Sequence, residues 1–226
     1  MIKIMADTAA DIDLATAQEL DITILPFMIH FGEKSVRADI NLDPDEFYTM
    51  LRDYDDIPST SQISPADIEE LYRAQGKDNS IIYITISSKA SGVHNSASLV
   101  AKQLTEEEGF DITVVDSTMF SYPIGYSVVE AAKMAKEGKS KEEILARLKE
   151  TYTRDTAYFM VDDLAFLKKG GRIKATTMAI GTMLDIKPIL NINDGLVEAY
   201  KKVRGTKKAL ATLVDYAVER MDNPQE

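Results

Sequence analysis

The stretch that most restricts the fold is an apolar, β-branched run at residues 81–86, which leads into a serine-rich turn and then a helical pattern. Because such a strand needs cover on both faces, it predicts the centre of a parallel sheet. The turn contains Ser87, Ser88, Ser91 and Gly92, and the N–H groups that open the helix point outward from it. This arrangement is suited to an anion. Helix capping is the simpler role for any single serine, but three hydroxyls beside one glycine favour a ligand.

Composition excludes several classes of function. The chain has 226 residues and a formal net charge of −11, which argues against nucleic acid or an anionic membrane surface as the main partner. It has no cysteine, which rules out disulfides, a thiol nucleophile and thiolate-bound metals. His30 and His94 are its only histidines, too few for a histidine metal cluster. The first residues read as a strand without signal-peptide features, and no apolar run has membrane-spanning length, so we expect a cytoplasmic protein without stable membrane insertion.

A β-to-α step recurs through residues 1–153. Apolar runs at 2–6, 81–86 and 112–115 each end in a polar turn. In an open parallel sheet these turns lie at one edge, where ligands bind. The sequence therefore predicts an N-terminal α/β/α parallel-sheet domain whose ligand edge carries Asp7-Thr8, residues 88–92 and Asp116-Ser117.

The pattern changes after residue 153, and residues 154–226 predict a second, mixed-sheet α/β domain. A short helix ends at Gly170-Gly171 and displays Arg172 directly afterwards. Residues 187–203 predict a β-hairpin around Asn193-Asp194-Gly195, followed by an amphipathic helix from Thr206.

A second hydroxyl-bearing loop spans residues 58–62, just before a helix that begins at Ser64-Pro65. Thr60 and Ser61 thus lie outside a helix N-terminus. His30 follows an extended run at 22–29 that Pro26 interrupts. No Ser or Asp neighbours His30 in the sequence, so we interpret it as a strand-end residue rather than a catalytic base.

A neutral site for a carboxylate fits these residues better than the alternatives. The turn lacks P-loop spacing, and isolated turn carboxylates usually cap or solvate rather than bind a cation. Thr60, Ser61, Ser91 and the Gly92 N–H can all donate to a carboxylate. An apolar tail would then supply most of the affinity, and several methionines could line it, namely Met119, Met134, Met160, Met178 and Met183.

The combination of motifs resembles the DegV family. The segments that carry the resemblance are Asp7-Thr8-Ala9-Ala10-Asp11, Thr60-Ser61-Gln62-Ile63-Ser64-Pro65, Ser91-Gly92, Val115-Asp116-Ser117 and Gly170-Gly171-Arg172-Ile173.

The resemblance implies a bacterial, two-domain protein that binds one long-chain fatty acid in a tunnel between the domains. Its carboxylate would be held by Thr60, Ser61, Ser91 and Gly92. The protein would be the lipid-binding subunit of a fatty acid kinase. Arg172 would contact a separate ATP-binding subunit that performs the phosphorylation. This chain itself would then be neither an enzyme nor a holder of metal or cofactor, and we expect a monomer.

Two features depart from the family pattern. Val93 and His94 stand where the family commonly has Thr and Tyr. Family members also extend further and carry a C-terminal histidine that this chain lacks, so we expect the second domain to be incomplete.

Two other interpretations stay open. One is an enzyme acting on a small carboxylate or phosphate metabolite, with Asp116, Ser117 and His94 as active groups. The other is a regulatory module whose bound lipid reports membrane status.

Overall fold

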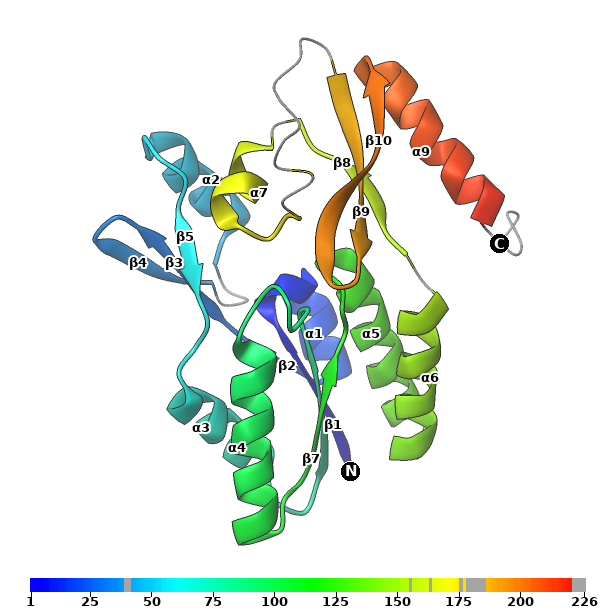
Figure 1. Cartoon of the computed structure of the whole chain (residues 1–226). Helices are drawn as coiled ribbons and strands as arrows, with labels where there is room; N and C mark the ends of the chain where they lie inside the picture. The colour runs from blue at the N-terminus through cyan, green and yellow to red at the C-terminus, as the bar shows by residue number, and fades with distance from the viewer. Residues whose placement is uncertain (39–41, 155, 163, 175–176, 178–185, 221–226) are drawn as a thin grey trace. The chain divides into compact units, whose positions relative to one another are not determined.

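The computed structural model describes residues 1–38, 42–154, 156–162, 164–174, 177 and 186–220 (Figure 1). The chain forms two compact units, Met1–Asp155 and Thr156–Glu226, which are described separately. Among the described residues, no helix is both long and apolar enough to span a bilayer.

A parallel four-stranded sheet forms the centre of the first unit. Its strands are β1 (Ile2–Asp7), β2 (Ile22–Leu25), β6 (Ser80–Thr85) and β7 (Asp111–Asp116), in the order β2-β1-β6-β7. All three pairings are parallel. The predicted fold class, a mixed α/β protein with a parallel N-terminal sheet, is confirmed.

Helices cover both faces of this sheet (Figure 1). They are α1 (Leu14–Leu20), α3 (Pro65–Ala74), α4 (Val93–Glu108) and α5 (Tyr122–Lys136), and α6 (Lys141–Arg154) packs on α5. Met5 and Tyr83 pack with α3 and α4, where the Tyr72 ring meets Tyr83 edge-on at 6.3 Å. Because side chains alternate along a strand, Ile4 and Ile82 point to the opposite face, which α5 covers.

The first unit also contains an antiparallel sheet that the sequence analysis did not predict. Its strands are β3 (Phe27–Phe31), β4 (Lys34–Ala38) and β5 (Ser59–Ser61), in the order β4-β3-β5. The prediction of a loop at residues 58–62 was wrong, because residues 59–61 form strand β5. Pro26 separates β2 from β3 because it has no N–H for a ladder, and Gly32, with φ of 61°, allows the tight β3–β4 turn.

Helix boundaries follow the capping signals closely. Helix α2 (Pro44–Asp53) is capped by Asp43, and α3 by a reciprocal capping box between Ser64 and Asp67. Helix α4 ends at Gly109 in the left-handed conformation. Helix α5 begins at Tyr122, with Pro123 in its first turn.

The second unit contains the predicted hairpin. Strands β9 (Ile186–Asn193) and β10 (Leu196–Arg204) pair antiparallel, and β8 (Tyr158–Met160) joins the other side of β9. Helix α9 (Thr206–Arg220) packs on this sheet, with Ala209 buried against Ile189. Helix α7 (Ala165–Gly170) is the short helix expected before Arg172.

Thr8 connects the two sheets of the first unit. Its hydroxyl accepts from the Phe27 N–H at 3.1 Å and lies 3.0 Å from the Leu25 carbonyl oxygen and 2.8 Å from that of Ala38. One side chain at the end of β1 therefore holds β2, β3 and β4 together.

Replacing Thr8 by Val keeps the shape but removes the hydroxyl. The half-buried Phe27 N–H then loses its acceptor. We therefore expect the free energy of unfolding, measured in urea, to fall by about 1–3 kcal/mol. Thr105→Val on exposed α4 surface is the matched control. Equal stability of the two variants would contradict the role of Thr8.

Candidate functional site

The polar turns after β1, β6 and β7 are joined to one another by hydrogen bonds. The Asp7 carboxylate accepts from the Ile86 N–H at 2.8 Å, and the Asp116 carboxylate accepts from the Ser88 N–H at 3.1 Å. The Ser117 N–H donates to the Thr85 carbonyl at 3.2 Å. The three strand ends predicted to share one edge of the sheet are thus held together.

Asp7 is a fully buried carboxyl group that the sequence analysis treated only as a turn residue. Its second oxygen accepts from the Ala9 N–H at 3.1 Å. Burial raises the pKa of Asp7 to about 7, although the two backbone hydrogen bonds, from Ile86 and Ala9, act in the opposite direction. Asp7 therefore fixes the start of the β6–α4 turn from within the core.

The N-cap residue of α4 has no side chain to cap the helix. Gly92 is the N-cap residue, with φ of −73° and ψ of −5°, and is exposed. The half-buried Ser91 uses its hydroxyl oxygen to accept from the Val93 N–H at 3.3 Å. Ser87 shapes the turn, since its carbonyl accepts from Ser91 at 3.1 Å and its hydroxyl oxygen from the Lys89 N–H at 3.3 Å. These contacts give Ser87 a role in the turn.

Thr60 and Ser61 are exposed neighbours on β5 that point to opposite faces of the antiparallel sheet. Thr60 pairs with Ile29 of β3, and Ser61 pairs with Met28. The Ser61 hydroxyl lies 2.8 Å from His30 Nε2, and His30 Nδ1 lies 2.8 Å from the Ser35 hydroxyl. The sequence analysis missed both serines: Ser35 lies across the β3–β4 hairpin, five residues away, and Ser61 comes from the more distant β5.

Gln62 joins β5 to the start of α4, and the sequence analysis assigned it no separate role. Its Nε2 donates to the Ser96 hydroxyl at 2.9 Å. Its Oε1 is buried and has no hydrogen-bond partner among the described residues. A Cβ atom at position 92 would lie 3.0 Å from this oxygen, so the glycine allows the close approach. Only strand pairing and helix packing reveal this contact.

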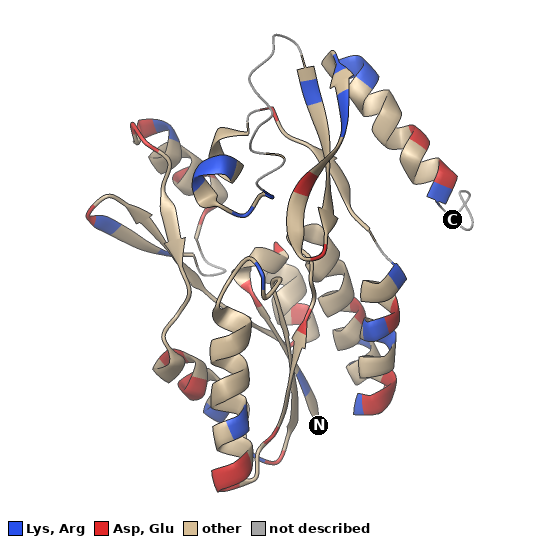
Figure 2. Ribbon diagram, in the orientation of Figure 1, with Lys and Arg blue, Asp and Glu red and all other residues tan. Residues whose placement is uncertain are grey.

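The segments that meet here carry almost no charge. Residues 80–101 contain one charged side chain, Lys89, and residues 57–64 contain none. Figure 2 shows the acidic residues of α4 at its far, C-terminal end, where Glu106, Glu107 and Glu108 lie. Any anion at the start of α4 would be held by neutral donors and the helix dipole.

The three residues that an enzyme would use as active groups, Asp116, Ser117 and His94, make contacts within the fold. Asp116 accepts from the N–H groups of Ser88 and Thr118, and the Ser117 hydroxyl contacts the backbone of Met119. The nearest hydrogen-bonding contact of His94 is the Thr85 hydroxyl at 3.2 Å. No Ser-His contact of a hydrolase forms between His94 and Ser117 in the described part of the chain.

Arg172 lies in the second unit after a left-handed Gly171, as the Gly pair predicts. Its side chain is exposed and donates to the Gly170 carbonyl, and its own carbonyl accepts from the Val197 N–H at 3.3 Å. The turn therefore fixes the arginine backbone against β10 while the guanidinium stays accessible.

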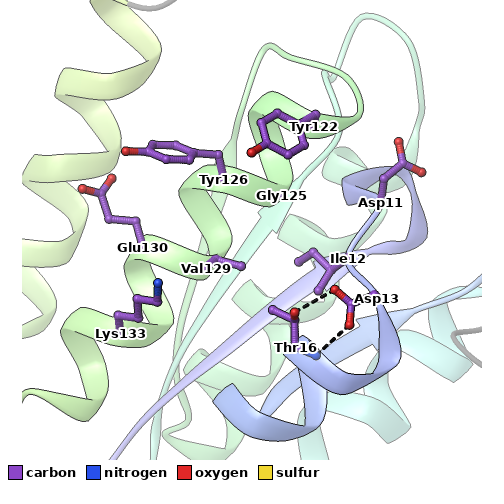
Figure 3. A pocket seen from close by; sticks show the side chains of 10 residues that line it. All are labelled: Asp11, Ile12, Asp13, Thr16, Tyr122, Gly125, Tyr126, Val129, Glu130 and Lys133. Carbon is purple, nitrogen blue, oxygen red and sulfur yellow. Dashed lines mark hydrogen bonds between the residues drawn. The ribbon is translucent and has the colours of Figure 1, made fainter. Parts of the chain in front are cut away.

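A hollow of about 430 Å³ lies between α1 and α5 (Figure 3). Tyr122 and Tyr126 lie along its α5 side, opposite Asp11 and Asp13. At Gly125 the helix passes so near Ala10 that a Cβ would lie 2.3 Å from the Ala10 carbonyl oxygen. This hollow includes none of the residues predicted to bind a ligand. Of the methionines expected to line a tail, Met119 is buried in this unit, while Met178 and Met183 lie outside the described residues.

Known proteins match this chain along its whole length. A family model described as an uncharacterised protein of the DegV family matches residues 1–226. A DegV domain-containing protein of Caldanaerobacter subterraneus is 36% identical over 216 residues, which are 95% of this chain and 76% of that protein.

Solved structures are also similar to this chain. One described as fatty acid binding of a DegV family protein from Thermus thermophilus has 31% identity and a TM-score of 0.87, covering 98% of this chain and 78% of the other. A stearic acid-binding protein from Eubacterium ventriosum has 26% identity and a TM-score of 0.88, with 98% and 77% covered.

Asp7 gives stability a specific pH dependence. Because its pKa is raised from 3.8 to about 7 on folding, the folded state holds an extra proton between these values. The contribution of Asp7 to the free energy of unfolding is therefore greatest below about pH 4. It decreases by up to ~1.4 kcal/mol per pH unit as the pH rises, and it is lost above about pH 7.

The Asp7→Asn variant has an amide in place of the carboxyl group, so position 7 takes up no proton on folding. Its free energy of unfolding, measured in urea from pH 4 to 8, should therefore rise relative to wild type as the pH increases. Parallel pH profiles of the two proteins would show that Asp7 titrates normally.

Proposed function

The chain belongs to the DegV family, and from this premise we propose that it binds one long-chain fatty acid by its carboxylate. The proteins of similar structure that are described as fatty acid binding support the ligand class. The observation in this chain that carries the proposal is the start of α4 at Gly92, which Gln62 ties to the end of β5 through Ser96. Residues 57–64 and 80–101, which meet there, carry one charged side chain.

The proposed head-group donors are the hydroxyls of Thr60 and Ser91 and the N–H of Gly92. Each hydrogen bond to a carboxylate contributes about 1.5–3 kcal/mol, and the helix dipole adds about 0.3–1 kcal/mol. Ser61 faces the other side of β5 and contacts His30, so its part in holding the carboxylate stays a prediction.

The acyl tail would provide most of the affinity, since each buried CH₂ contributes about 0.8 kcal/mol. The neutral head-group residues would set the polarity and position of the ligand. That the tail runs in a tunnel between the two domains stays a prediction.

We further propose that this protein presents the bound carboxylate to the ATP-binding subunit of a fatty acid kinase. In this arrangement the phosphorylation is performed by the partner, and this chain acts as a cytoplasmic, monomeric carrier. The exposed Arg172 on its Gly-Gly turn is the proposed contact with the partner.

Native mass spectrometry of the purified protein, as isolated and after addition of palmitate, tests the ligand. We expect one fatty acid per chain. Ser91→Ala should lower the palmitate affinity about tenfold by removing one hydrogen bond to the carboxylate. Ser98→Ala, on the same helix, is the control. A wild-type protein that neither carries nor accepts a long-chain acid would exclude the proposal.

Arg172→Ala separates lipid binding from partner contact. We expect palmitate loading to stay within about twofold of wild type, because the substituted side chain is on the surface. Phosphorylation of the bound acid by a fatty acid kinase subunit should fall sharply. Lys169→Ala, on the same helix end, should change neither. An Arg172 variant that supports normal phosphorylation would remove this residue from the partner surface.

A further inference from the structure

The hollow between α1 and α5 carries two exposed tyrosine rings and shares no residue with the proposed head-group site (Figure 3). Tyr122 and Tyr126 lie one turn apart on α5 and so share a face, where they are 73% and 52% exposed. Neither ring packs on another aromatic ring, and neither hydroxyl makes a hydrogen bond within the described ranges. Exposed aromatic rings of this kind are typical of surfaces that bind a partner.

The floor of the hollow is fixed by the packing of α5 on the turn before α1. A Cβ at Gly125 would lie 2.3 Å from the Ala10 carbonyl oxygen, so glycine is needed for this close approach. The half-buried side chains of Ile12 and Val129 lie between the two walls. The hollow is therefore built into the packing of the two helices.

The wall opposite the tyrosines is acidic. Asp11 and Asp13 are both exposed, and hydrogen bonds from Thr16 lower the pKa of Asp13, so that it is ionised at neutral pH. The Asp11 carboxylate accepts from the Ser121 hydroxyl through one oxygen. Its other oxygen has no partner in the described part of the chain and is available to a donor.

The remaining charges of the lining do not cancel this acidic wall. Glu130 is paired with Arg147 of α6, whose Nε lies 2.9 Å from the carboxylate. Lys133 is seven residues beyond Tyr126, which is about 10 Å farther along α5 at ~1.5 Å per residue. The end of the hollow that holds the tyrosines is therefore complementary to a positive charge.

A guanidinium group matches both walls of the hollow. It is planar, is weakly hydrated, stacks on aromatic faces and has several N–H donors for carboxylates. An ammonium group is more strongly hydrated, and this exposed lining replaces its water incompletely. A quaternary ammonium has no N–H to donate to Asp11. The lining therefore favours a guanidinium over other organic cations.

An arginine in a protein suits the hollow better than a free small molecule. The tyrosines and aspartates are so exposed that a single bound side chain would leave them largely in water. Neighbouring residues of a protein segment can cover the Tyr122 ring and add to the affinity. Tyrosine and arginine are also the residues that contribute most at protein interfaces, and the net charge of −11 attracts a basic partner.

We propose that the hollow between α1 and α5 receives an arginine side chain from a partner protein. The guanidinium stacks on Tyr122 and Tyr126 and donates to the Asp11 carboxylate, while Asp13 adds negative charge. This inference concerns a different surface from the proposed lipid site and does not depend on lipid binding.

A pentapeptide with a central arginine between alanines, blocked at both ends, tests the site on the whole chain. We expect it to shift the ring resonances of Tyr122 and Tyr126 saturably in NMR spectra, with a Kd on the order of a millimolar. The same peptide with citrulline has a neutral urea group in place of the guanidinium and should give no saturable shift. No response to the arginine peptide, or an equal response to both peptides, would overturn the proposal.

Two substitutions locate the contact. Asp11→Asn keeps the left-handed backbone and an acceptor for Ser121 but removes the charge, and should raise the Kd about tenfold. Tyr126→Leu should raise it about threefold by removing one ring face. The matched controls, Asp21→Asn at another left-handed position and Tyr48→Leu at another exposed ring, should stay within about twofold of wild type. Wild-type affinity in both Asp11→Asn and Tyr126→Leu would contradict the assignment.

Two further probes identify the source of the cation. N-acetylarginine N-methylamide, which cannot cover Tyr122, should bind at least about threefold more weakly than the pentapeptide. Putrescine, a free diammonium ion, should also bind more weakly. Equal affinity for the pentapeptide and the blocked amino acid, or tighter binding of putrescine, would overturn a protein partner in favour of a small free cation.

Discussion

Hydrogen bonds from the end of β1 hold the polar edge of the first unit. Asp7 binds the Ile86 N–H and so fixes the turn after β6, while Thr8 binds β2, β3 and β4. These contacts help to hold the antiparallel sheet on the parallel sheet. The placement of β5 beside the start of α4 therefore depends on two adjacent side chains that touch no ligand in the proposed site.

The chemistry of the proposed site follows from this placement. The N-cap residue of α4 is a glycine, and Gln62 ties this helix to the end of β5. Residues 57–64 and 80–101 together carry one charged side chain, Lys89. Neutral donors hold a carboxylate without the strong desolvation that a buried ion pair would require.

The parallel sheet and the Ser91-Gly92 turn could be predicted because they follow from local patterns: a β-branched run, a hydroxyl-rich turn and a helical period. The β3-β4-β5 sheet could not, since β5 is three residues long and pairs with a strand about thirty residues away. The contacts of Gln62 and His30 depend on that pairing, so the sequence pattern contained no signal for them. Asp7 is a turn residue by sequence, and only its burial reveals its raised pKa.

The position of the carboxylate in a crystal structure of the palmitate-loaded protein tests the central claim most directly. The claim predicts both carboxylate oxygens at the start of α4, within about 3 Å of the Ser91 hydroxyl or the Gly92 N–H and of the Thr60 hydroxyl. A carboxylate bound elsewhere, for example in the hollow beside Tyr122 and Tyr126, with the start of α4 occupied only by solvent, would contradict it.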